Sequence, residues 1–378
     1  SIITISGCLA AWLLLCSLSH GLELRVKNPY GAAQNNAIIT GGLPFPKGAL
    51  KDVAQLRVEL DGKALPAQFV KTVPWDDGSV RWALLDTQVA LPANGSAKLN
   101  LTTGDSPAPS SPVTIQQNDK GVTVSTGPLA LLCRNDLPGL IQSIRVDGKE
   151  LLTGEGRGPV MTLTDGKEIV AAAPTEVTVE ESGPMRAFIR LKGVFPGIHK
   201  DLVRYTARIY VYAGRKIAKV HFWLENHGAD GHGKVKPEWF VFEAMGLEFG
   251  LGLGNTVAAR CEDAKGTGKF KVLQQCQGDG KEPDYTYEDL DYIITSGDET
   301  LKKGKRTDGI VELKGEKGTL TAGIRYFWQT YEKAIELDGN SLMLHLWPKE
   351  GEWPRPVKGR GGRLKRLKHV IQGKDYSY

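Results

Sequence analysis

The sequence PWDDGSVRWALLD, residues 74–86, sets the fold because it joins a tight turn directly to a β-strand. Residues 76–78, Asp-Asp-Gly, have the composition of a turn that tolerates a positive φ. The residues after this turn alternate with a period of two. Val80 and Trp82 are therefore predicted to share an apolar, aromatic face, and Arg81 to lie on the opposite face. The stretch indicates an antiparallel β-hairpin.

Short alternating runs continue on both sides of this hairpin, from residue 22 to residue 104. Examples are LRVEL at 56–60 and LPAQFV at 65–70, which are separated by a short turn sequence. Strands at this spacing, with no helical period between them, are typical of a small antiparallel barrel or sandwich. Residues 105–112 then contain three prolines and three serines, and we expect them to form an interdomain linker.

From residue 113 to about residue 350 the pattern stays β and the runs become longer. The clearest runs are 176–180, 185–191, 205–212 and 219–226. Each has one polar and one apolar face, as expected for a sandwich whose sheets are each solvated on one side. The sequence therefore predicts an all-β chain, in which a small β-barrel or sandwich is followed by a larger antiparallel β-sandwich.

Two pairs of motifs resemble the PcRGLX/YetA-like family, which includes exo-acting rhamnogalacturonan lyases. The first pair is ITGGLPFPKG at 39–48 with WDDGSVRW at 75–82, and the second pair is EESGPMRA at 180–187 with RIYVYAG at 208–214. The resemblance implies a RIFT-type β-barrel over residues 22–104 and a central β-sandwich domain over residues 113–350.

In that family a large α/α-toroid domain follows the sandwich and contains the lyase chemistry. Residues 351–378 instead form a basic tail, with seven Lys/Arg and one Asp from Lys358 onward, and show no toroid pattern. We therefore expect this chain to lack the catalytic domain, and no catalytic residue is carried over from the family. The tail itself is interpreted either as a contact for acidic glycan or as a truncated or disordered end.

The formal net charge is +5 over 378 residues, and the excess lies in this tail. The rest of the chain is close to neutral, which argues against a nucleic-acid partner. Residues 1–21 contain an apolar run that ends in small polar residues, and they predict a secretory signal peptide. An uncleaved anchor and a lipoprotein signal are the alternatives. We expect a secreted or periplasmic/cell-surface protein with no stable membrane span after signal cleavage.

Three cysteines lie outside the signal sequence. Cys133 lies in an apolar run and is predicted to be a buried free thiol. Cys261 and Cys276 are close enough in sequence to close a short disulfide loop in an oxidising compartment. No pair has Cys-x-x-Cys spacing, which excludes a zinc ribbon and a thioredoxin-type redox site.

The turn and the strand after it also supply the candidate carbohydrate-binding residues, which are Trp75, Asp77, Arg81 and Trp82. An indole stacks on the face of a pyranose ring, and a guanidinium pairs with a uronate carboxylate. The same composition suits a buried ion pair with a purely structural role. The sequence leaves both interpretations open.

A glycine-rich loop supplies the candidate metal ligands, which are His227, Asp230 and His232. Imidazole and carboxylate groups bind divalent metals, and an imidazole also serves as a base. A solvated loop is the alternative. The acidic segment at residues 284–292 lacks the rhythm of a calcium-binding loop, so we expect it to be a solvated surface.

These observations predict the β-rich portion of a rhamnogalacturonan-lyase-like protein that contacts acidic pectic polysaccharide. Two alternatives from other classes remain. One is a stand-alone carbohydrate-binding or cell-surface structural protein, and the other is a glycoside hydrolase whose carboxylates come from distant strands. A divalent cation is the one cofactor that the sequence leaves open.

Overall fold

Regular structure in this protein is almost entirely β-strand. The computed structural model describes residues 2–5, 22–228, 240–276 and 290–350, and the short strands at 356–358, 364–366 and 369–371. Within these residues the only helices are two short 3-10 helices, η1 (Val53–Gln55) and η2 (His199–Asp201). The predicted all-β class is confirmed. The chain divides into two compact units.

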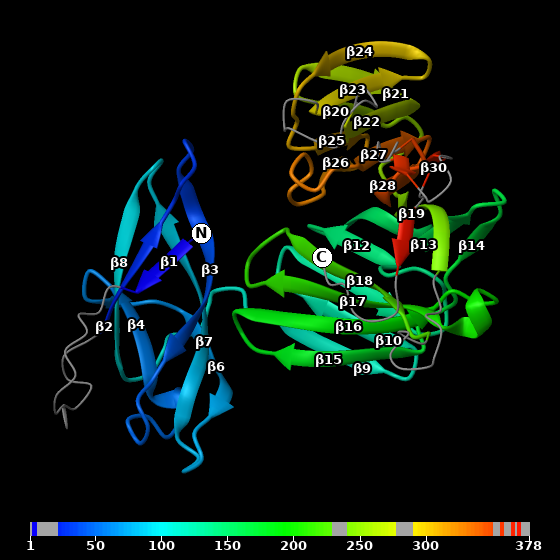
Figure 1. Cartoon of the computed structure of the whole chain (residues 1–378). Coiled ribbons are helices and arrows are strands. Elements are labelled where there is room, and N and C mark those ends of the chain that lie inside the picture. Colours follow the sequence, from blue (N-terminus) through cyan, green and yellow to red (C-terminus); the bar gives the residue numbers. More distant parts are fainter. Residues whose placement is uncertain are drawn as a thin grey trace. The chain divides into compact units, whose positions relative to one another are not determined.

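Unit 1 comprises Ser1–Thr114 together with two segments from later in the chain, Glu180–Phe188 and Tyr210–Ala218. It contains a five-stranded sheet of order β1-β2-β8-β4-β5 and a three-stranded sheet of order β3-β7-β6, blue to cyan in Figure 1. The strands are β1 (Ile2–Ile5), β2 (Leu22–Lys27), β3 (Gln34–Pro44), β4 (Leu56–Leu60), β5 (Lys63–Ala64), β6 (Ala67–Pro74), β7 (Val80–Leu91) and β8 (Ser96–Thr103). All printed pairings in both sheets are antiparallel.

The core of unit 1 lies between these two sheets, because strands from both direct apolar side chains into it. Leu24 and Val58 in the first sheet, and Ile39 and Leu85 in the second, are at most 1% exposed. Burial of one such side chain contributes about 1.5–3 kcal/mol to stability. Residues 105–113, between β8 and β9, contain no strand.

The strand after the turn departs from the alternation expected from the sequence. Trp82 pairs with Val73, but the next pair toward the turn is Val80 with Pro74, so Arg81 is an extra residue on β7. Such a β-bulge shifts the alternation by one residue. Val80 is therefore fully buried, whereas Arg81 is exposed and Trp82 is 40% exposed. The prediction that Trp82 shares a face with Val80 is wrong, because of this bulge.

Unit 2 comprises Ile115–Val179, Ile189–Ile209 and Lys219–Tyr378. Its largest sheet has the order β24-β23-β22-β27-β28-β19-β13-β12-β11-β10-β9, with β14 added to β13 and β31 added to β19. A four-stranded sheet of order β15-β16-β17-β18 forms a second layer over β9 and β10 in Figure 1. Smaller sheets have the orders β21-β20-β25-β26 and β29-β30.

The strands of this larger region have the following bounds. They are β9 (Thr114–Asn118), β10 (Gly121–Ser125), β11 (Leu129–Arg134), β12 (Ser143–Val146), β13 (Lys149–Leu163), β14 (Glu168–Val170), β15 (Glu176–Ser182), β16 (Arg186–Val194), β17 (Val203–Tyr212), β18 (Ala218–Asn226), β19 (Phe240–Leu251), β20 (Ala258–Cys261), β21 (Ala264–Thr267), β22 (Lys269–Cys276), β23 (Leu290–Ser296), β24 (Glu299–Gly304), β25 (Ile310–Gly315), β26 (Gly318–Gly323), β27 (Lys333–Asp338), β28 (Ser341–Trp347), β29 (Pro356–Lys358), β30 (Leu364–Arg366) and β31 (His369–Ile371).

The two layers of the sandwich bury their facing side chains. Val124 and Leu131 on one sheet, and Leu191 and Ile209 on the other, are at most 1% exposed. Cys133 belongs to this core as a buried free thiol, which confirms the prediction. Burial in an apolar site raises the pKa of its thiol far above the ordinary value.

Cys261 is also a buried free thiol, with its Sγ atom 3.9 Å from Thr307 Oγ1. Cys261 therefore does not form the disulfide with Cys276 that the sequence allowed. Burial raises the pKa of this thiol as well.

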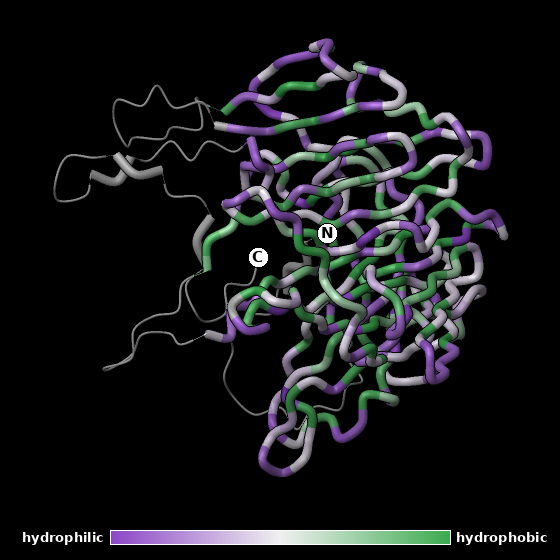
Figure 2. Tube along the Cα trace, turned by 90° about the vertical axis from the view of Figure 1, so that its right-hand side faces the viewer, coloured by the Kyte–Doolittle hydropathy of each residue, from purple (hydrophilic) through white to green (hydrophobic). Residues whose placement is uncertain are grey.

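Hydropathy along the chain follows the strands. Figure 2 shows hydrophobic and hydrophilic residues alternating along the trace of the described segments. In the part of the chain that the structure describes, no helix has the length and apolar character needed to span a membrane. Of the signal sequence predicted at residues 1–21, only residues 2–5 are described, as strand β1, and most of the basic tail also lies outside the described residues.

Candidate functional site

The turn between β6 and β7 is built by Asp77, Gly78 and Ser79. Asp77 Oδ1 accepts hydrogen bonds from the Ser79 amide at 3.0 Å and from the Ser79 hydroxyl at 2.5 Å. These bonds lower the pKa of Asp77 below its ordinary value. Gly78 adopts a φ of 80°, as the Asp-Asp-Gly composition predicts. Asp77 therefore stabilises the turn, and its Oδ1 atom already accepts two hydrogen bonds.

Arg81 lies over the ring of Trp75, with its Cζ atom 4.7 Å from the ring centroid. The Trp75 indole is fixed in turn, because its Nε1 donates a hydrogen bond to the Phe45 carbonyl at 3.0 Å. Arg81 is exposed and forms no ion pair with any described residue. The interpretation of this region as a buried ion pair is therefore wrong. The nearby carboxylate of Asp76 pairs instead with Lys47, at 2.6 Å.

Trp82 lies beside Arg81 in sequence and is also exposed, as a consequence of the β-bulge. A Cβ atom at Gly42 would lie 3.4 Å from Trp82 Cε3, so one side of the indole packs on that glycine. Val73, which pairs with Trp82 across the hairpin, is 41% exposed. We call Val73, Trp75, Arg81 and Trp82 the turn surface. It combines two indoles with a guanidinium that no described carboxylate neutralises.

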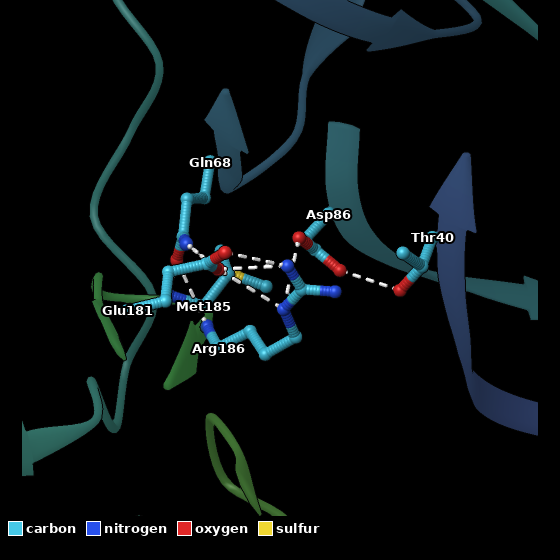
Figure 3. A network of polar contacts seen from close by, with 6 residues as sticks. All are labelled: Thr40, Gln68, Asp86, Glu181, Met185 and Arg186. Atoms are coloured by element: carbon cyan, nitrogen blue, oxygen red, sulfur yellow. Dashed lines mark hydrogen bonds and ion pairs between the residues drawn. The ribbon is translucent and has the colours of Figure 1, made fainter. Parts of the chain in front are cut away.

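A second polar cluster is buried in unit 1, as Figure 3 shows. Arg186 forms a forked pair with Glu181, with its Nη2 atom 2.8 Å from each carboxylate oxygen. Its Nε lies 3.3 Å from Asp86 Oδ2, and Asp86 Oδ1 accepts a 2.5 Å hydrogen bond from Thr40 Oγ1. The side chains of Arg186 and Asp86 are 6% and 3% exposed.

Gln68 completes this buried cluster. Its Oε1 accepts hydrogen bonds from the backbone amides of Met185 at 3.0 Å and Arg186 at 2.9 Å. Its Nε2 donates to Glu181 Oε1 at 2.8 Å. One glutamine amide thus binds both the backbone and the carboxylate of the 180–188 segment, which fixes that segment to β6.

The charges of this cluster do not balance, because one guanidinium faces two carboxylates. Burial raises the pKa of Asp86 from 3.8 to about 6, against the opposing effects of Arg186 and the Thr40 hydrogen bond. The sequence analysis did not predict the cluster, although the stretch at 180–187 was singled out for its resemblance. With its side chains withdrawn from solvent, the cluster serves structure rather than ligand binding.

The candidate metal ligands are only partly described. His227 is exposed, and its Nε2 atom lies 2.9 Å from Glu225 Oε2. Asp230 and His232 lie outside the described residues, as does most of the acidic segment at 284–292. Among the described side chains, no group of three or more His, Cys, Asp or Glu residues is placed to hold a metal ion.

His227 instead lines a pocket of about 410 Å³ in unit 2. Lys192, Asp201, Arg204 and Glu225 line the same pocket, and they come from β16, η2, β17 and β18. The sequence analysis pointed to His227 alone, because the other lining residues are dispersed between positions 175 and 225. Asp201 and Glu225 both line this pocket, but Asp201 lies in η2 and not in a strand, so the hydrolase alternative with carboxylates from distant strands stays a prediction.

Two family models match this chain. Residues 24–102 match the PcRGLX-like N-terminal RIFT barrel domain, and residues 113–257 match the PcRGLX-like protein central beta sandwich domain. A curated relative from Bacillus subtilis (strain 168), "Uncharacterized protein YetA", is 25% identical over 384 residues. That alignment covers 83% of this chain and 43% of YetA, so the chain spans less than half the length of this relative.

Proposed function

We propose, given that this chain belongs to the PcRGLX/YetA-like family, that its β domains handle the polysaccharide substrate of a rhamnogalacturonan-lyase-related protein. The specific proposal is that the turn surface binds acidic pectic polysaccharide. The lyase chemistry would then reside outside the residues that the two family models match, 24–102 and 113–257, and the protein would act at the cell surface or after secretion.

One observation carries the proposal, namely the exposed Arg81 guanidinium stacked on Trp75 beside the exposed Trp82 indole. A guanidinium binds a carboxylate through two parallel hydrogen bonds, and an indole presents a flat apolar face to a sugar ring. The bulge on β7 places both groups on the solvent side of one hairpin. Backbone pairing in that hairpin fixes their spacing before any ligand arrives, which lowers the entropic cost of binding.

The same surface lacks what β-elimination next to a uronate requires. That reaction needs a base for the α-proton and an acid for the leaving oxygen, in addition to a cation for the carboxylate. Arg81 would supply the cation. Asp77, the closest carboxylate in sequence, has its Oδ1 bound to Ser79, and its pKa is lowered, so it is a weak base. The turn surface therefore supports binding and not catalysis.

The expected affinity of the turn surface for its ligand is modest. An exposed ion pair contributes about 0.2–1 kcal/mol, and an aromatic stack contributes about 0.5–1.5 kcal/mol. Arg81→Gln is therefore expected to weaken binding by about twofold to fivefold, and Trp82→Ala by up to about tenfold. Repeated uronates along a polymer would raise the apparent affinity through multivalency.

The experiment combines binding with product analysis. Wild-type protein, Trp82→Ala and an exposed-site control, Tyr30→Ala, are titrated with rhamnogalacturonan fragments, while ultraviolet absorbance and product size are followed. Binding that Trp82→Ala weakens and Tyr30→Ala does not would support the proposal. Equal binding by all three proteins would refute it. Unsaturated products would place lyase chemistry within these β domains, and saturated products would favour the hydrolase alternative.

A further inference from the structure

We propose that the pocket lined by Lys192, Asp201, Arg204, Glu225 and His227 binds a carboxylate-bearing sugar residue, at a site separate from the turn surface. All of these residues belong to unit 2, so the pocket does not depend on any part of unit 1. The inference goes beyond the proposed function, because it stands on other residues and on a different kind of surface, an open pocket.

Arg204 provides the group that would recognise the carboxylate. Its Nε donates to the Asp201 carbonyl at 3.3 Å, which anchors the guanidinium. Its two terminal nitrogens make no hydrogen bond or ion pair with any described residue. An arginine held through Nε, with its terminal nitrogens available, is suited to bind a carboxylate. Lys192 adds a second cation to the pocket lining, and its Nζ lies 3.5 Å from Glu176 Oε2.

The acceptors in the pocket suit sugar hydroxyls. Glu225 is fixed by its contact with His227, since its Oε2 lies 2.9 Å from the imidazole Nε2. Asp201 is fixed through Oδ1, which accepts a 2.7 Å hydrogen bond from the Gly197 amide. Each carboxylate has a second oxygen that can accept from a ligand hydroxyl. Two acceptors and two donors around one pocket match a ligand that has both hydroxyls and an acid group.

The backbone holds these groups in place. Lys200 and Asp201 both adopt a positive φ, 57° and 61°, which is unusual for consecutive residues with side chains. The His227 amide donates to the Leu202 carbonyl at 2.8 Å, so the end of β18 is tied to the start of β17. Strained backbone of this kind persists where the surrounding structure fixes it, and it is common at binding sites.

Tyr205 and Gly193 form the inner wall. A Cβ atom at Gly193 would lie 2.3 Å from the Tyr205 ring, so glycine is required there. The ring stacks on Phe222 at 5.5 Å between centroids. The Tyr205 hydroxyl is buried and has no hydrogen-bond partner in the described structure. The protein therefore leaves one polar atom beside the pocket unsatisfied.

The charge of the pocket limits the class of ligand. Two cations line the pocket together with two carboxylates and one histidine, so the charged groups nearly balance and suit a ligand of low net charge. A metal ion would lack ligands, because no described group of three acidic, histidine or cysteine side chains converges there. A monoanion with several hydroxyls fits both the charge and the volume, which lies within the range of small-molecule sites. A uronate sugar has this chemistry.

The test uses galacturonate as the probe and galactose as its neutral counterpart. Wild-type protein should bind galacturonate more tightly than galactose. Arg204 is exposed, so Arg204→Gln should weaken galacturonate binding by about twofold to fivefold and leave galactose binding nearly unchanged. Glu225→Gln should weaken the binding of both sugars. The Arg204 side-chain Nε–Hε signal in NMR spectra should shift when galacturonate is added, which a purely structural arginine would not show.

The outcomes separate this inference from the proposed function. Arg325→Gln serves as the matched control, because it removes an exposed guanidinium of unit 2 that does not line the pocket, and it should leave galacturonate binding unchanged. Unchanged galacturonate affinity in Arg204→Gln, with a wild-type melting temperature, would overturn the pocket proposal. So would the absence of galacturonate binding to the wild type. Polymer binding that depends on Trp82 would survive either result.

Discussion

The wild-type protein should lose stability as the pH rises from about 4 to about 6, because buried Asp86 becomes charged. The Asp86→Asn variant should not show this loss. Asp86 is 3% exposed and shares Arg186 with Glu181, so its negative charge is poorly compensated. Burial raises its pKa to about 6 in the folded protein, against 3.8 for the ordinary carboxyl group. Asn has the same shape, accepts the Thr40 hydrogen bond and carries no charge.

The sign follows from proton binding. Between about pH 4 and pH 6 the folded state holds a proton on Asp86 that the unfolded state has released, so a rise in pH favours the unfolded state. The contribution to stability is complete below pH 3.8 and is lost as the pH passes through about 6. A shift from 3.8 to about 6 corresponds to ~3 kcal/mol, at 1.36 kcal/mol for each pKa unit.

Other carboxylates have the opposite dependence and would mask this effect in the wild type alone. Hydrogen bonds from Thr178 and Arg190 lower the pKa of Glu176 to about 2, and the bond from His345 lowers that of Glu336 to about 2. Both groups favour the folded state above about pH 4.5. The difference between Asp86→Asn and wild type cancels these contributions and isolates Asp86.

The assay is urea unfolding at about pH 4 and about pH 7.5. Unfolding is monitored by hydrogen exchange of peptides from β7, because these peptides report on unit 1. The free energy of unfolding of Asp86→Asn, relative to wild type, should rise by ~2.5 kcal/mol between the two pH values, because part of the ~3 kcal/mol is already lost at pH 4. A flat difference would refute the idea that burial governs this carboxyl group. A difference of opposite sign would mean that the ion pair with Arg186 outweighs burial.

Substitutions at Arg186, Tyr205 and Gly193 test the packing. Arg186→Met should destabilise unit 1 by about 3–5 kcal/mol in urea unfolding, because it leaves Asp86 and Glu181 as uncompensated buried charges, and a loss below about 1 kcal/mol would contradict this. Tyr205→Phe should leave the melting temperature unchanged or raise it, because the hydroxyl has no partner; a clear fall would show that this hydroxyl has one. Gly193→Ala should cost about 1–3 kcal/mol through collision with the Tyr205 ring, and Gly193→Ala combined with Tyr205→Ala should recover part of that steric cost in a double-mutant cycle.

Local pattern was sufficient to predict the main features of the fold. Period-two alternation and turn composition gave the all-β class, the hairpin at residues 74–86 and the buried thiol of Cys133. The bulge at Arg81 was not predicted, because an extra residue on β7 can be recognised only from the pairing between β7 and β6. Alternation read from one strand alone cannot show where a partner strand skips a residue.

The sites were harder to predict because their residues are far apart in sequence. Gln68 and Asp86 contact Glu181 and Arg186, although about a hundred residues separate the two pairs in sequence. A polar residue in an alternating strand looks like a solvent-facing position unless its partner is known. The sequence around Arg186 contained one usable signal, because the charged residues Glu181 and Arg186 lie in the same short segment as apolar residues. The adjacent residues Met185 and Ala187 are both buried in the structure.

Binding at the turn surface can be tested with two forms of one polymer. Rhamnogalacturonan fragments and the same fragments with their carboxyl groups reduced to alcohols are titrated by calorimetry into wild-type protein and Arg81→Gln. We predict that wild type prefers the acidic form by about twofold to fivefold, and that Arg81→Gln loses this preference while it still binds the reduced form through Trp82. Equal affinity of the wild type for both forms, or an unchanged preference in Arg81→Gln, would contradict the account.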